Sequence, residues 1–255
     1  MPVLESEAVV LRRYPFSEAD LVVVFFTREF GKLRAVAAGA KRTRSRLGGA
    51  LEPLNHVRLR FFLKEGAELG RVTECETLHS YLGRSPSPER LYSFSYLAEI
   101  IQEIVQENHT NYLLFRLFLA TLEVGENSEP GPLLLRYFEF WTLRLSGFLP
   151  NYGYCSTCER YVKEEGFFAD PESGLGRCRD CARERGLRVR SEAAKLLGKI
   201  FQLSPAQFAS LPAAAADARD LGRLTQRLLA LHLEKKLKSY AFVRKLEDAL
   251  ADTSP

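Results

Sequence analysis

Four cysteines in two closely spaced pairs place the strongest constraint on how this chain can fold. The segments "CSTC" and "CRDC" contain Cys155, Cys158, Cys178 and Cys181, with nineteen residues between the pairs. In a reducing cytoplasm, thiols at this spacing are far more often zinc ligands than disulfide partners, because each C-x-x-C turn can present two thiolates to one tetrahedral ion. The spacing therefore predicts one Zn²⁺ per chain, bound by these four residues.

The same pattern indicates that the metal is structural. Four protein ligands complete a tetrahedron and leave no position for a reacting water molecule. Between the pairs, "GFFAD" is typical of a strand and "DPESGLG" of a turn, so we expect residues 150–187 to form a zinc-finger insert. The fifth cysteine, Cys75, lies in a predicted strand and is expected to be a small buried hydrophobic residue.

The N-terminal third of the chain has the pattern of short strands separated by turns. Segments rich in Val, Leu, Phe and Thr predict five strands, at residues 7–14, 20–27, 32–39, 56–63 and 69–77. The prolines and serines of "GRSPSPER" then end this region. We expect residues 1–80 to form a small five-stranded barrel domain.

Helical periodicity follows on both sides of the cysteine insert. Apolar residues at three-four spacing predict helices at residues 88–108, 110–125 and 131–147, and again at 191–201, after Ser204, and at 217–238. Residues 81–149 and 188–255 are therefore expected to form one helical domain. The predicted fold class is α+β, with a barrel followed by an all-α domain that carries an inserted zinc module.

Positive charge is concentrated in the segment "GAKRTRSRLGG", residues 39–49, which we name the basic loop. Its cations are Lys41, Arg42, Arg44 and Arg46. No acid occurs between Glu29 and Glu52, a stretch that also contains Lys32 and Arg34. Because like charges in a glycine-flanked loop repel one another, we expect this loop to bind the phosphates of an anionic partner.

Two other basic patterns leave two interpretations open. In "VRLRFF", Arg58, Arg60 and Phe62 share one strand face, which is either an ordinary solvated surface or a surface for a polynucleotide with flat bases. Arginines at four-residue intervals from Arg219 to Arg227 lie on one helix face, which is more often solvated than a second phosphate site.

No motif in the chain assembles a reaction centre. The sequence lacks a phosphate-binding G-x-x-x-x-G-K-[ST] loop, a deaminase H-x-E beside the cysteines, and a cluster of acids suited to two metal ions. We therefore expect a protein that is not an enzyme. No run of eighteen apolar residues occurs and the N-terminus carries acids, so a cytoplasmic protein without a membrane partner is expected.

Three segments carry a resemblance to a known family over essentially the whole chain. They are "SEADLVVVFFTREFGKLRAVAAGAKRTRS" in the barrel region, "GFLPNYGYCSTC" at the start of the zinc module, and "LKSYAFV" near the C-terminal helices. Together with the order of barrel, helices, cysteine insert and helices, they resemble the bacterial DNA repair protein RecO family.

The resemblance implies a fold and a function. The barrel would be an OB-fold that binds single- and double-stranded DNA. The protein would anneal complementary strands and act with RecR to load recombinase onto strands coated by single-strand-binding protein, in DNA repair by homologous recombination. The C-terminal tail of that coating protein would dock on the helical region, and the protein would be cytoplasmic and associated with the nucleoid.

The DNA contacts are expected on the barrel. The predicted residues are Lys32, Arg34, Lys41, Arg42, Arg44, Arg46, Arg58, Arg60 and Phe62. The alternative is a protein-protein interaction module whose basic loop docks acidic tails. A third possibility is a hydrolase that acts on nucleic acid and carries a zinc ribbon.

Overall fold

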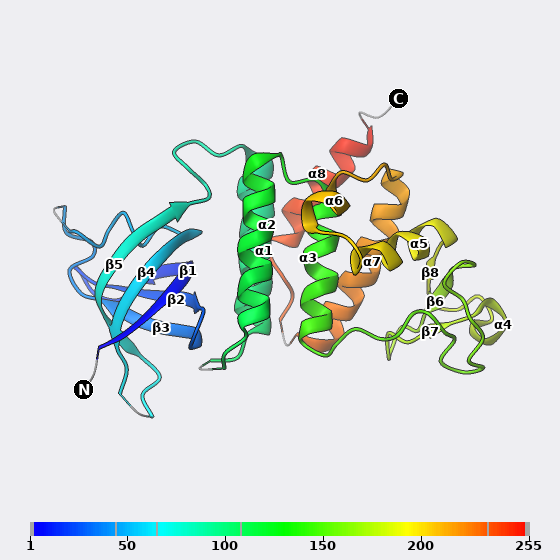
Figure 1. Cartoon of the computed structure of the whole chain (residues 1–255), viewed down its shortest axis with the longest axis horizontal. Coiled ribbons are helices and arrows are strands. Elements are labelled where there is room, and N and C mark those ends of the chain that lie inside the picture. Colours follow the sequence, from blue (N-terminus) through cyan, green and yellow to red (C-terminus); the bar gives the residue numbers. More distant parts are fainter. Residues whose placement is uncertain (1–2, 44, 65, 108, 234, 253–255) are drawn as a thin grey trace. The chain divides into compact units, whose positions relative to one another are not determined.

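Five strands at the N-terminal end close into a barrel (Figure 1). They are β1 (Leu4–Pro15), β2 (Leu21–Thr27), β3 (Gly31–Ala37), β4 (Asn55–Phe62) and β5 (Gly70–Ser80). Their order around the barrel is β1-β2-β3-β5-β4, with β1 also paired to β4. All pairs are antiparallel except β3 with β5. This is the OB-fold arrangement, and the expected barrel is confirmed.

This computed structural model describes residues 3–43, 45–64, 66–107, 109–233 and 235–252, with side chains as far as residue 248. The chain divides into two compact units, Met1–Glu126 and Asn127–Pro255. The division lies 46 residues beyond the boundary expected after residue 80. Among the described helices, none combines the length and hydropathy needed to cross a membrane.

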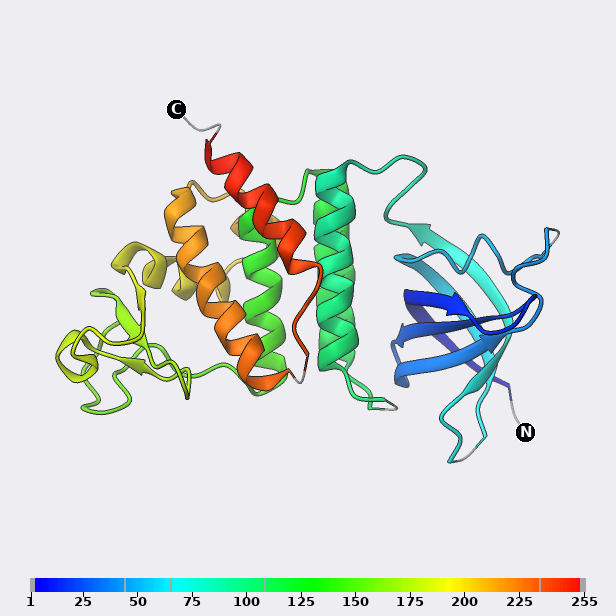
Figure 2. The ribbon, with the colours of Figure 1, turned by 180° about the vertical axis from the view of Figure 1, so that it is seen from behind.

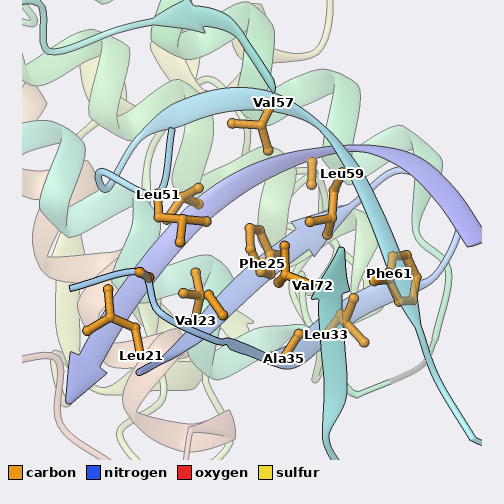
Figure 3. Close-up of a cluster of buried hydrophobic side chains, with 14 residues drawn as sticks. Leu21, Val23, Phe25, Leu33, Ala35, Leu51, Val57, Leu59, Phe61 and Val72 are labelled. Atoms are coloured by element: carbon orange, nitrogen blue, oxygen red, sulfur yellow. The ribbon is translucent and has the colours of Figure 1, made fainter. Parts of the chain in front are cut away.

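The barrel interior is filled by alternating, inward-facing residues of its five strands (Figure 3). In β4, Val57, Leu59 and Phe61 are fully buried, whereas the intervening residues are partly or fully exposed. This period of two is the pattern expected of a sheet with one buried face. Each such side chain contributes about 1.5–3 kcal/mol of hydrophobic stabilisation.

Strand β2 is buried at all seven positions because both of its faces are covered. Its outward-facing Phe26 contacts Phe115 and Phe118 of α2 (Tyr112–Asn127), with ring centroids 5.5 and 6.4 Å apart. The preceding helix, α1 (Pro88–Ile104), begins at a Ser87 cap whose Oγ accepts a hydrogen bond from the Arg90 amide. One outer face of the barrel is therefore occupied by helices of its own unit.

The second unit contains the remaining helices and a small sheet. The helices are α3 (Pro132–Leu145), α4 (Arg179–Ala182), α5 (Ser191–Ile200), α6 (Pro205–Ala209), α7 (Ala215–His232) and α8 (Tyr240–Asp252). The expected helix start at Ser204 is confirmed by a capping box with Gln207. The helix expected at 217–238 ends instead at His232, because the chain becomes extended at Leu233.

The small sheet lies between the two cysteine pairs and after the second pair. Its strands are β6 (Phe167–Ala169), β7 (Gly176–Arg177) and β8 (Leu187–Val189), in the order β7-β6-β8. Since β8 pairs with β6 along its length, the domain boundary expected at residue 187 falls inside this strand. The strand predicted in "GFFAD" is confirmed as β6.

A candidate nucleic-acid interface and a four-cysteine cluster

The basic loop is anchored at its base to the turn that joins β1 and β2. The Gly39 amide donates to Asp20 Oδ1 at 2.8 Å, and the Lys41 amide donates to the Ala19 carbonyl at 2.9 Å. The hydrogen bond from Gly39 is the largest cause that holds the pKa of Asp20 below its ordinary value. Gly39 adopts a φ of +68°, a conformation that favours glycine.

The other end of the loop is fixed by the barrel core. Leu51 is fully buried in the barrel cluster, and Asn55 Nδ2 donates to the carbonyls of Gly49 and Ala50. The described cations between these anchors lie in solvent. Lys41, Arg42 and Arg46 are exposed.

The exposed loop cations have no carboxylate partners among the described residues. Lys41 Nζ donates to the carbonyl of Ser17 at 3.0 Å, and neither Arg42 nor Arg46 forms an ion pair within the described chain. Arg44 lies outside the described residues. The loop therefore displays positive charge that the described part of the protein does not neutralise by an ion pair.

The cations of the β4 outer face are paired across the sheet. Arg58 Nη1 lies 2.9 Å from Glu76 Oε2 on β5, and Arg60 Nε lies 2.6 Å from Glu5 Oε2 on β1. Arg60 also pairs with Glu74 at 3.2 Å. These partners follow from the register, in which Glu76 faces Arg58 and both Glu5 and Glu74 face Arg60.

The two cationic groups nevertheless meet at one open cavity. Arg46 from the basic loop and Arg58 and Arg60 from β4 line a space of about 670 Å³, together with Glu74 and Glu76. Phe62, predicted to offer stacking, lies at the end of β4 opposite Arg71 and is partly buried. The structure thus places Arg46 beside Arg58 and Arg60, on the face of β4 that was predicted to contact DNA.

Lys32 and Arg34 contact the last turn of α1 and the segment that follows it. Lys32 Nζ donates to the Gln102 carbonyl at 2.7 Å. Arg34 Nε lies 3.0 Å from Glu107 Oε1, and its Nη2 lies 3.3 Å from Glu68 Oε2. Both cations are therefore engaged with their own unit in this structure.

Two exposed aromatic residues beside the loop were missed by the sequence analysis. Tyr14 at the end of β1 is 37% exposed, and Phe16 in the following turn is 59% exposed. That turn also contains Ser17, whose carbonyl accepts from Lys41. An aromatic residue in the otherwise polar turn "YPFSEAD" is the signal that could have identified them, because exposed rings beside cations can stack on bases.

The four predicted metal ligands converge in the second unit. One ligand atom from each of Cys155, Cys158, Cys178 and Cys181 lies within 4.8 Å of the others. The sulfurs of Cys158 and Cys178 are 3.7 Å apart. A Zn–S distance of about 2.3 Å corresponds to a sulfur separation of about 3.8 Å along the edge of a regular tetrahedron. The cluster can therefore hold a tetrahedral metal ion.

Backbone geometry prepares one of these thiols for metal binding. Burial opposes ionisation of Cys155, but backbone hydrogen bonds from Cys178, Cys158 and Thr157 lower its pKa to about 6. In contrast, hydrogen bonds within the cluster and burial raise the pKa of Cys181 to about 12. Four neighbouring thiols cannot all ionise without a cation, so a metal would bind here in competition with protons.

Cys75 is separate from this cluster and lies in a strand as predicted, but it is only partly buried and not the buried residue that was expected. It lies in β5, is partly exposed, and lines the cavity beside Arg58 and Arg60. Burial raises the pKa of its thiol to about 12. It is therefore a protonated thiol at neutral pH and a useful reference for the four clustered cysteines.

Comparison with known proteins identifies relatives along nearly the whole chain. The family profile "Recombination protein O N terminal" matches residues 1–81, and "Recombination protein O C terminal" matches residues 85–241. The chain is 37% identical over 245 residues to the DNA repair protein RecO of Koribacter versatilis, covering 95% of this chain and 99% of that protein.

Two further relatives carry the same name. The DNA repair protein RecO of Desulforudis audaxviator is 33% identical, with 95% of this chain and 96% of that protein covered. The corresponding protein of Geobacter metallireducens is 31% identical, with 95% and 97% covered. The resemblance expected from the sequence is confirmed, and this chain belongs to the RecO family of DNA repair proteins.

Proposed function

We propose that this protein is a non-enzymatic recombination mediator that binds single- and double-stranded DNA through the basic loop. The observation that carries the proposal is the set of exposed cations at Lys41, Arg42 and Arg46, which form no ion pair among the described residues and are displayed by an anchored loop of an OB-fold. OB-folds with basic, aromatic-bearing surfaces bind nucleic acid through backbone charge and base stacking.

The geometry favours recognition of the backbone without regard to base sequence. Loop cations can follow phosphates whose positions vary, and the rings of Tyr14 and Phe16 can stack on any base. Arg58 and Arg60, also predicted as contacts, are paired with Glu5, Glu74 and Glu76 and would reach phosphate only by leaving these carboxylates, so the proposed interface does not depend on them. Lys32 and Arg34 would have to leave their present partners to take part.

Strand annealing follows from the same charges. Complementary strands repel one another through their phosphates, and a protein that neutralises both backbones lowers this barrier. Base pairing then supplies the driving force, so no bond chemistry is needed. As a member of the RecO family, the protein would act in the cytoplasm on the nucleoid, with RecR and with the tail of single-strand-binding protein as partners.

We also propose that the cysteine cluster holds one structural Zn²⁺. The ion would be bound by Cys155, Cys158, Cys178 and Cys181, whose sulfur spacing fits a tetrahedron. A site with four thiolate ligands has no open position, so the metal supplies folding free energy to the module. The small β6-β7-β8 sheet has few buried residues of its own to replace that contribution.

Binding of labelled oligonucleotides at several salt concentrations tests the main proposal. The wild-type protein should bind oligomers of different base sequence with similar affinity, and log affinity should fall linearly with log salt, by roughly 0.7 per phosphate contact on single strands. It should also accelerate pairing of complementary strands and leave both strands intact when magnesium or zinc is added. Binding of glutamate-rich peptides without any binding of oligonucleotides would instead support an interaction module.

Metal analysis tests the second proposal. The purified chain should contain one zinc per molecule. Cys155→Ser or Cys178→Ser should remove the metal and lower the melting temperature of the second unit, whereas Cys75→Ala should retain it. Equal metal content in all three variants would contradict the assignment of the ligands.

A further inference from the structure

A second arginine-rich surface lies in the C-terminal unit and consists of residues other than those assigned to DNA binding so far. It is an open cavity of about 480 Å³ between β8, α7 and α8, the last two drawn in orange and red in Figure 2. No lysine lines it, and its cations are Arg188, Arg190, Arg219, Arg223 and Arg244. We name this cavity the arginine pocket.

Two of these arginines are fixed by one buried acid. Asp220 is 3% exposed and accepts hydrogen bonds from Arg190 Nε at 2.6 Å and Arg223 Nη2 at 2.5 Å. Burial would raise the pKa of Asp220, but the hydrogen bonds from the two guanidinium groups hold it below its ordinary value. Asp220 therefore orients two guanidinium groups. Arg190 Nη2 also lies 3.0 Å from Asp217 Oδ1, so two carboxylates balance these two arginines, and the uncompensated charge of the pocket comes from its other arginines.

The other three arginines form no ion pair within the described part of the chain. Arg188, Arg219 and Arg244 are exposed. The acid Glu247 in the same lining pairs with buried Arg136 at 3.2 Å, and the remaining acid is the exposed Asp248. The lining thus has an excess of positive charge.

Buried contacts beneath the pocket hold its walls in place. Arg136 on α3 is fully buried and binds Glu139 at 2.9 Å, while Thr225 Oγ1 on α7 donates to the same carboxylate. Gly222 allows this approach, because a Cβ at that position would lie 1.8 Å from Arg136 Nη1. With Glu247 of α8 bound to Arg136 as well, α3, α7 and α8 are tied together through the Arg136–Glu139 pair.

We propose that the arginine pocket is a second site for the phosphates of a nucleic-acid backbone. Guanidinium groups bind phosphate oxygens in a bidentate manner, and here they come from three separate elements. The positive charge also continues out of the pocket along α7, where Arg219, Arg223 and Arg227 are all exposed and stand about 6 Å apart. A line of evenly spaced cations suits a polymer of phosphates better than a single carboxylate terminus.

A second site would let one protein molecule hold both strands during annealing. With one strand on the basic loop and another on the arginine pocket, a single protein molecule would neutralise two backbones. The inference goes beyond the proposed function because it concerns different residues in the other compact unit. It can therefore fail while DNA binding by the basic loop stands.

The test uses the full-length, zinc-loaded protein and fluorescein-labelled twenty-nucleotide oligothymidine. Arg219→Ala with Arg244→Ala removes two exposed cations without touching the buried Arg136 contacts. This variant should lower the slope of log affinity against log salt by about 1.4, or roughly 0.7 per lost phosphate contact. The matched control removes Arg185 and Lys199, two exposed cations of the same unit outside the pocket, and should leave the slope unchanged.

Photo-crosslinking gives a readout that does not depend on affinity. Oligothymidine with one 5-iododeoxyuridine should crosslink to the peptide that contains Tyr240, an aromatic residue in the pocket lining. The crosslink should persist when the basic-loop cations are replaced by alanine and disappear when Arg219 and Arg244 are replaced.

Two results would overturn the proposal. One is an unchanged salt slope in the Arg219→Ala, Arg244→Ala variant together with no crosslink at Tyr240. The other is a decaglutamate peptide whose binding depends on Arg219 and Arg244 while oligothymidine binding does not, which would assign the pocket to an acidic peptide. In both cases a loss of DNA binding in the basic-loop variant would still support the proposed function.

Discussion

The basic loop and the outer face of β4 have similar positive charge in sequence but different electrostatic surroundings in the structure. On the loop, Lys41, Arg42 and Arg46 form no ion pair among the described residues. On β4, Arg58 and Arg60 are both paired with carboxylates of the two neighbouring strands. Positive charge in a strand must therefore be counted together with its cross-strand neighbours before it is assigned to a ligand.

The difference in ion pairing determines the distance over which each region can attract DNA. An ion pair has a much weaker field at a distance than an isolated cation, and salt reduces it further beyond a Debye length of about 10 Å at 0.1 M. The loop should therefore dominate the attraction of DNA. Four variants test this comparison.

Removal of the loop cations should have the largest effect. Replacing Lys41, Arg42, Arg44 and Arg46 with alanine should lower the slope of log affinity against log salt by about 2 to 3, because about 0.7 is lost per phosphate contact on single strands. Affinity at low salt should fall by about a hundredfold or more. Fluorescence anisotropy with labelled oligothymidine measures both quantities.

The loop variant needs a control for its loss of net charge. Arg84, Arg185, Lys199 and Lys235 are four exposed cations outside the candidate interface, and their joint replacement by alanine should change the slope little. An unchanged slope in the loop variant would show that these cations serve another purpose.

Loss of the Phe16 ring should have the next largest effect. Stacking of a base on an aromatic side chain contributes about 1–3 kcal/mol, so Phe16→Ala should weaken binding roughly tenfold. Because stacking releases no counterions, the salt slope should stay the same while the whole line shifts to weaker binding. Leu113, which is 58% exposed against 59% for Phe16, gives a matched control as Leu113→Ala.

The candidate site divides into parts that local sequence could predict and parts that it could not. The cysteine cluster was predicted because two C-x-x-C turns determine their ligands almost entirely by local spacing. The basic loop was predicted because its charges are adjacent in sequence. In contrast, the partners of Arg58 and Arg60 lie on β1 and β5, and only the register of the sheet reveals them.

The environment of Lys32 and Arg34 has the same kind of explanation. These residues contact the end of α1 and the segment that follows it, and no short-range pattern shows that this part of the chain lies against the barrel. One signal was present: β2 is apolar at nearly every position, which is typical of a strand buried on both faces. This apolar segment indicates that another element packs on the outer face of β2, and Phe115 and Phe118 of α2 do so.

Removal of the acids opposite β4 should convert the paired face into a binding face. Glu74→Gln with Glu76→Gln keeps the side-chain shape and releases part of the pairing of Arg58 and Arg60. If both arginines then reach phosphates, the salt slope should rise by about 1.4 and affinity at low salt should increase several-fold. Glu192→Gln, which releases Lys195 in the other unit, is the control and should not change the slope.

Removal of the two β4 arginines together with two of the acids that pair with them should have the smallest effect on DNA binding. Replacing Arg58, Arg60, Glu74 and Glu76 together with glutamine removes two cations and two anions, so the net charge of the barrel is unchanged. Exposed ion pairs contribute only about 0–1 kcal/mol each, and the variant should keep its fold. Its affinity for oligothymidine should stay within about twofold of the wild-type value, with the same salt slope.

A slope lower by about 1.4 would contradict this expectation, because it would mean that Arg58 and Arg60 exchange their carboxylates for phosphates when DNA binds. The paired face would then be a masked part of the interface, and the contrast with the basic loop would exist only in the free protein.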